Sequence, residues 1–193
     1  MEDWNEALYH YYKKTGGIFT GEIQSSYQEC RLFLKYGEEN VLLEPVIKGV
    51  GNGWITFRAH AVISGGLDKP FSLTIQPYGI LKRAVELVRR QDIITGDKEL
   101  DKRYLIRSSE PEFVKMSLNG SRLSQRLLAS KEIEISVKPV KPGERLHMIE
   151  AVTKEVINEN LVETQFCPSD DSLSELVELC RETWRTVSEY RMV

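Results

Sequence analysis

Alternation of apolar and polar residues with a period of two dominates the first half of the chain. In "CRLFLKY" (30–36) and "WITFRAHAVI" (54–63), every second residue belongs to one apolar set. This spacing sends successive side chains to opposite faces of a strand. "VLLEPVI" and "FSLTIQ" supply further strands, and Asn52-Gly53 suits a tight hairpin turn. The pattern predicts a mostly antiparallel meander of four or five strands between residues 17 and 77.

Other segments carry apolar residues at helical spacing. The last of them is the most regular, because Leu173, Leu176, Cys180, Trp184 and Val187 keep one face over four turns. Ser169-Asp170-Asp171 before it favours the positive end of a helix dipole. We expect helices at Asp3–Lys14, Ile80–Gln91, Pro111–Leu118, Ser121–Ala129 and Leu173–Val187.

Two further strands are expected in the second half, in "YLIRS" and "EIEISVK". The segment "RLHMIEAVTKEVI" fits two templates, since its apolar residues also satisfy helical spacing. A strand is our interpretation, because "LVETQF" after "NEN" would then complete a meander. The sequence alone does not decide whether residues 146–157 form a strand or a helix.

The order of these elements indicates the fold class. Strands and helices are segregated more than a regular βαβ alternation would allow, which indicates an α+β fold with a largely antiparallel sheet. The 193 residues are enough for one domain with a proper core. We therefore expect a single domain over 1–193, with a possible subdivision near 91–101.

Composition limits the kinds of partner and the cellular compartment that we expect. The net charge of -3 argues against a protein that mainly neutralises nucleic-acid phosphates, so nucleic acid is not the expected partner. Cys30, Cys167 and Cys180 are too few and too widely spaced for a disulfide framework or a zinc site. The start "MEDWNEALYHYY" has no basic and apolar leader, and no long apolar run follows. We expect a cytoplasmic protein without membrane insertion.

Three carboxylates in "ITGDKELDKRY" raise the question of a metal site. Asp97, Glu99 and Asp101 match the first ligand positions of a calcium loop. Lys102 then stands where that loop needs glycine, and Ser108 stands where it needs a bidentate glutamate. Nearby lysines neutralise the carboxylates, so we interpret the stretch as a solvated connector and expect no metal.

Two other candidate sites are equally poor matches to known chemistry. "KGVGNGW" has alternating glycines, but the strand-like "WITFRAH" follows where a phosphate-binding loop requires a helix. Cys167 before the last helix is the least poor candidate for a nucleophile. No feature of the sequence nominates His60 or His147 as its base, and His10 has no metal-binding companion. We expect no cofactor.

Two surfaces are candidates for binding a partner or ligand. One is the basic stretch from Lys82 to Arg107, diluted by acidic residues. The other is the strand face opposite Ala59 and Ala61, which would be exposed if helices cover only one side of the sheet and would be core if they cover both. The candidate residues are Trp54, Arg58, His60, Arg83, Arg89, Arg90 and Arg103.

The stretch "IITGDKELDKRYLIRSSEPEFVKMSL", followed by "RLSQRLLAS", resembles a domain of uncharacterised bacterial proteins. In that domain a "tGD..FD..F.V" stretch precedes a helix that begins near proline and a short leucine-rich helix. Leu100 stands where the pattern usually has phenylalanine. The resemblance implies no activity and no catalytic residue.

These observations favour a non-catalytic α+β module that binds another protein or associates with itself. Meander sheets leave edge strands that need cover, which makes self-association a natural form of this hypothesis. The alternative is a small hydrolase that uses Cys167 or carboxylates brought together by folding. A nucleic-acid-binding role predicts retention on a polyanion that fades steeply with salt.

Overall fold

The computed structural model describes residues 4–24, 29–51, 54–78, 93–130, 133–153 and 167–189. For 46–51 and 54–58 only the backbone is described. Four predicted features lie outside these residues: the helix at 80–91, the Asn52-Gly53 turn, residues 154–157 and the strand in "LVETQF".

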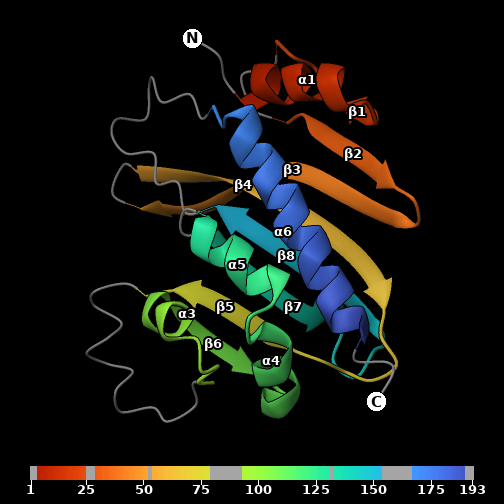
Figure 1. The fold of residues 1–193 in the computed structure, drawn as a ribbon. Helices are drawn as coiled ribbons and strands as arrows, with labels where there is room; N and C mark the ends of the chain where they lie inside the picture. Colours follow the sequence, from red (N-terminus) through yellow and green to blue (C-terminus); the bar gives the residue numbers. More distant parts are fainter. Residues whose placement is uncertain are drawn as a thin grey trace.

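The described strands form one antiparallel sheet in the order β1-β2-β3-β4-β8-β7-β5-β6. It runs through the whole molecule as a twisted layer (Figure 1). The strands are β1 (Ile18–Thr20), β2 (Arg31–Tyr36), β3 (Glu39–Gly51), β4 (Trp54–Gly66), β5 (Leu73–Pro77), β6 (Tyr104–Ser108), β7 (Ile133–Pro139) and β8 (Leu146–Thr153).

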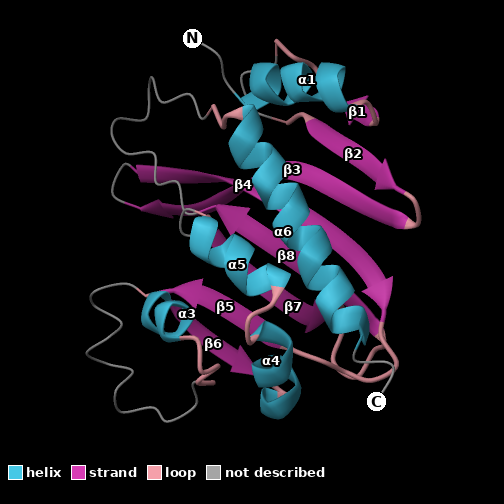
Figure 2. Ribbon diagram, viewed as in Figure 1, coloured by secondary structure: helices cyan, strands magenta, loops and turns pink. Residues whose placement is uncertain are grey.

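The helices lie together on one face of this sheet (Figure 2). Among the helices that the structure describes, none combines the length and the apolar character that a membrane crossing requires. They are α1 (Trp4–Thr15), α3 (Lys98–Arg103), α4 (Pro111–Leu118), α5 (Arg122–Ala129) and α6 (Asp170–Ser188). The fold is α+β, as the order of elements predicted.

The predicted meander is correct for β2 to β4 and wrong for β5; the short β1 was not predicted. β1, β2, β3 and β4 are consecutive neighbours, but the strand beside β4 is β8, which pairs with it from Gly66↔Leu146 to His60↔Val152. β5 instead lies between β7 and β6. Seven aligned residues of β8 give the edge of β4 a longer ladder than the five residues of β5 could supply. Residues 146–153 are therefore strand, which settles that part of the ambiguous segment.

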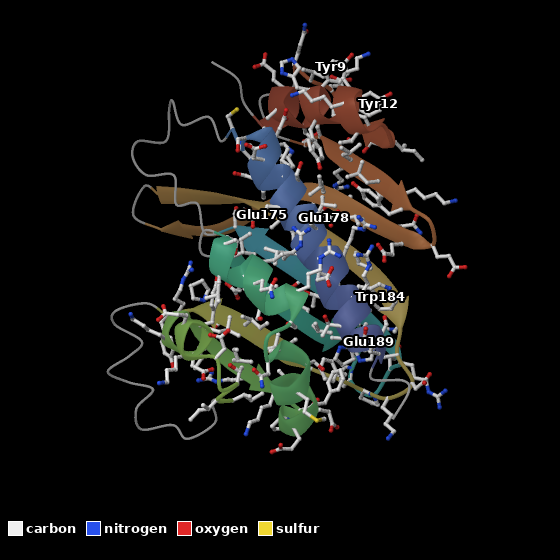
Figure 3. The ribbon with its side chains drawn as sticks, viewed as in Figure 1. Tyr9, Tyr12, Glu175, Glu178, Trp184 and Glu189 are labelled. Atoms are coloured by element: carbon white, nitrogen blue, oxygen red, sulfur yellow. The ribbon has the colours of Figure 1, made fainter. Side chains whose placement is uncertain are left out.

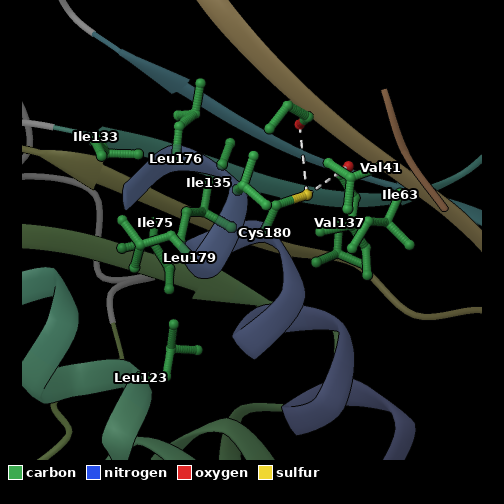
Figure 4. Packing of buried hydrophobic residues seen from close by; sticks show 14 of the residues in the cluster. Val41, Ile63, Ile75, Leu123, Ile133, Ile135, Val137, Leu176, Leu179 and Cys180 are labelled. Atoms are coloured by element: carbon green, nitrogen blue, oxygen red, sulfur yellow. Dashed lines mark hydrogen bonds between the residues drawn. The ribbon is translucent and has the colours of Figure 1, made fainter. Parts of the chain in front are cut away.

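The core fills the space between the sheet and its helices. α6 crosses the central strands and buries Leu176, Leu179 and Cys180 against residues such as Ile63 and Ile135 (Figure 4). The Cys180 thiol lies 3.5 Å from the carbonyl oxygens of Ala61 and Ile149, and its burial raises its pKa well above the ordinary value. This cysteine is a packing residue, because the nucleophilic thiolate form is suppressed.

Candidate functional site

We call the sheet face on which no described helix lies the open face. Alternation along each strand assigns residues to it: in β2, Leu32 and Leu34 are buried towards the helices, whereas Phe33 belongs to the open face. Phe33 is 41% exposed, and Ile18, its partner in β1, is 66% exposed. Two neighbouring large apolar side chains are thus left in solvent at one end of this face.

A row of charged side chains crosses the centre of the open face. Arg31 of β2 contacts Glu44 of β3 at 3.1 Å, and Lys138 of β7 contacts Glu150 of β8 at 3.1 Å. His60 of β4 lies between the two glutamates. We call these five residues the charged row. They come from β2, β3, β4, β8 and β7, which are five successive strands of the sheet.

His60 is the most buried member of the charged row, at 8% exposure. Its Nδ1 lies 3.6 Å from Glu44 Oε1, and its Nε2 lies 3.6 Å from Glu150 Oε1. Neither ring nitrogen has a hydrogen-bond partner within the described part of the chain. A buried polar group in that state requires an explanation, since such groups are nearly always bonded.

Glu150 is held strongly in its ionised form. The contact with His60 is the largest cause, and the bonds from Ser136 Oγ and Lys138 Nζ add to it, whereas burial opposes it. The balance lowers the pKa of Glu150 to about 2. Charges and hydrogen bonds that favour a carboxylate outweigh its partial loss of water here.

Among the predicted partner-binding residues, only His60 and Arg103 have described side chains, and they lie on different elements, β4 and α3. Trp54 and Arg58 lie on β4, in register with Gly51 and Val46 of β3, and their side chains are outside the described part. His60 is on the same strand but is buried rather than exposed. Arg83, Arg89 and Arg90 fall outside the described residues.

Arg103 lies at the end of α3, far along the sheet from His60. Its guanidinium donates to the carbonyl oxygens of Leu128 and Ser130, the latter at 3.1 Å. These carbonyls lie at the C-terminal end of α5. Arg103 therefore supports a helix C-terminus, where a cation is favourable.

Two of the three carboxylates of the connector, Asp97 and Asp101, have structural partners. Asp97 caps α3 by accepting from the backbone N–H groups of Glu99 and Leu100 at 3.0 and 3.2 Å. Asp101 accepts from the N–H and hydroxyl of Thr95 and from the N–H of Gly96. The polar connector thus contains a short helix that the sequence pattern did not predict; Asp97 at an N-cap position was the available signal.

His147, one of the two histidines considered as a base for Cys167, has structural partners. His147 is fixed by the backbone: Phe71 N–H donates to its Nε2 at 2.9 Å, and its Nδ1 lies 2.7 Å from Arg145 O. The Ser136 hydroxyl donates to Glu150 and not to His60. Cys167 is exposed. Across the described ranges, no three histidine, cysteine, aspartate or glutamate side chains are grouped so that they could hold a metal ion.

The helix side of the sheet carries a second charged cluster that sequence reasoning missed. Arg181 of α6 bonds Glu39 and Glu178 at 2.6 Å each, and its guanidinium lies over the Tyr36 ring at 3.9 Å from the centroid. Glu178 and Trp184 mark this part of α6 in Figure 3. The cluster ties α6 to the β2–β3 turn. We interpret the cluster as structural, because its ion pairs join α6 to the sheet.

Comparisons of the chain with protein-family models, curated proteins and solved structures found no match. The resemblance of the "ITGDKELDKRY" region to a domain of uncharacterised bacterial proteins therefore stays a prediction.

Proposed function

We propose that this chain is a non-catalytic binding module and that the open face of the sheet is its binding surface. One observation carries the proposal: all described helices cover one face, while the other face leaves Ile18 and Phe33 in solvent beside a row of charges. Exposed apolar side chains rimmed by polar groups are typical of sites that bind other proteins.

The partner is a protein or a second copy of the chain. Ile18, Phe33 and Leu42 are successive partners across β1, β2 and β3, so the apolar end of the face is continuous. The charged row lies beside it and would form the polar part of an interface. Light scattering over a range of concentrations tests the second-copy form; a mass that stays monomeric throughout would contradict it.

Photo-crosslinking tests the binding surface itself. A benzophenone amino acid replaces Phe33 on the open face, and in a matched variant it replaces Met116, which is 71% exposed on α4. In living cells we expect a discrete crosslinked product from position 33 and none from position 116. Equal products from both positions, or none from position 33, would contradict the proposal.

A further inference from the structure

The charged row is incomplete unless His60 carries a positive charge. In the order of the strands, its members are Arg31, Glu44, His60, Glu150 and Lys138. The outer two are positively charged, and the two glutamates on either side of His60 are negatively charged. Each glutamate has a cation on its outer side. His60 is the only described ionisable group between the two glutamates.

The donors and acceptors of an imidazole ring also match the two carboxylates only when both nitrogens are protonated. A neutral imidazole has one N–H donor and one bare nitrogen that can only accept. Both nitrogens of His60 face carboxylate oxygens, which are acceptors. In either neutral tautomer a bare nitrogen therefore faces a carboxylate, which is repulsive, whereas the doubly protonated ring presents a donor to both.

We propose that His60 binds a proton in the folded protein and acts as a pH-sensitive clasp that joins β3, β4 and β8 on the open face. The proton completes a five-strand row of alternating charges. When it is lost, one carboxylate contact becomes unfavourable at the centre of the sheet. The clasp needs no partner, so it stands apart from the proposed binding function.

The other charged groups around the ring are few. Glu44 faces it from β3 and Glu150 from β8, while Arg31 of β2 and Lys138 of β7 bind the far sides of these carboxylates. Glu134 of β7 lies beyond Val152 and accepts from Gln76 at 2.8 Å, so its carboxylate is engaged elsewhere. The two nearest charged groups are therefore both carboxylates, which can accept only from protonated ring nitrogens.

The sign of the pH effect follows from this arrangement. The folded protein holds the proton through two carboxylates that the unfolded chain does not bring together. The stabilisation is therefore complete where the folded and the unfolded chain both hold the proton, and it is lost as the pH rises through the point at which the folded protein releases it.

Nitrogen-15 NMR of the histidine side chains tests the clasp directly. At about pH 6 we expect His60 in the wild-type protein to show the imidazolium pattern, with two protonated nitrogens. His147 is the internal control: its Nε2 accepts from Phe71 N–H, so it must show a neutral pattern with the proton on Nδ1. A neutral pattern for His60 under these conditions would overturn the proposal.

Variants separate the clasp from a general effect of charge. E44Q and E150Q each remove one carboxylate that faces the ring, and we expect each to shift His60 to the neutral pattern at a lower pH than in the wild type. E144Q removes a carboxylate that pairs with Lys141 between β7 and β8, away from the ring, and it should leave the titration of His60 unchanged. Equal shifts in all three variants would overturn the proposal.

Thermal unfolding tests the same proposal independently of the NMR spectra. The gap in melting temperature between wild type and H60Q should be about twofold or more larger at pH 5.5 than at pH 8.5. A gap that does not change with pH would contradict the clasp.

Discussion

Adjacent side chains in one strand meet opposite environments. Leu34 of β2 is buried beneath the helices, whereas Phe33 beside it is exposed on the open face. Alternation in the sequence predicted this division and placed His60 opposite Ala59 and Ala61. It did not predict that His60 is buried, because Glu44 and Glu150 reach the ring from strands that only the folded sheet brings beside β4.

At the residue scale, Glu150→Gln should destabilise the protein by about 2–4 kcal/mol at neutral pH. A pKa lowered from 4.5 to about 2 corresponds to that amount. Glutamine keeps the size and an acceptor for Ser136 but loses the charge. Urea unfolding of the wild type and E150Q measures the difference, with the exposed Glu112→Gln as control.

The pH dependence of that difference has a defined sign. The lowered pKa means that Glu150 contributes its stability above about pH 4.5 and loses it as the pH falls towards 2. The two proteins should therefore converge in stability over this window. A difference that stays constant between pH 5 and pH 2.5 would contradict the assignment.

At the scale of elements, local signals fixed most helices and strands. Ser121 and Ser169 accept bonds from Ser124 N–H and Ser172 N–H, so side-chain caps begin α5 and α6, two helices that the sequence predicted. The position of β5 was not predictable in this way. Strand order depends on which distant strand forms the longer hydrogen-bonded ladder. The residues of β5 carry no local pattern that predicts β8 as the neighbour of β4.

The contact of α6 with β4 gives a matched pair of variants. A Cβ atom on Gly65 would lie 2.0 Å from the Trp184 ring, whereas one on Gly66 would have no atom within 4 Å. We expect Gly65→Ala to lower the free energy of unfolding by about 1–3 kcal/mol, because the packed ring must move. Gly66→Ala should cost much less. Thermal unfolding distinguishes them, and equal losses would contradict the close packing of α6 on β4.

At the scale of the whole molecule, the described residues form a sheet with one helix-covered face and one face on which no described helix lies. The sequence predicted the α+β class, the hairpin-rich first half and the long C-terminal helix. It left open whether one or both faces are covered, because alternating strands fit either arrangement when the second face is partly apolar. Because the described helices lie on the other side of the sheet, Ile18, Phe33 and the charged row form a candidate surface.

The central claim is that the Ile18 and Phe33 end of the open face is accessible in the isolated protein and covered by a partner in the cell. Maleimide labelling of Phe33→Cys tests it most directly, in a Cys167→Ser background because Cys167 is itself exposed. Leu34→Cys, at a buried position, is the control for local unfolding. We predict rapid labelling of position 33 in purified protein, marked protection of it in cells, and slow labelling of position 34 in both. Equal rates at position 33 in cells and in purified protein would contradict the account.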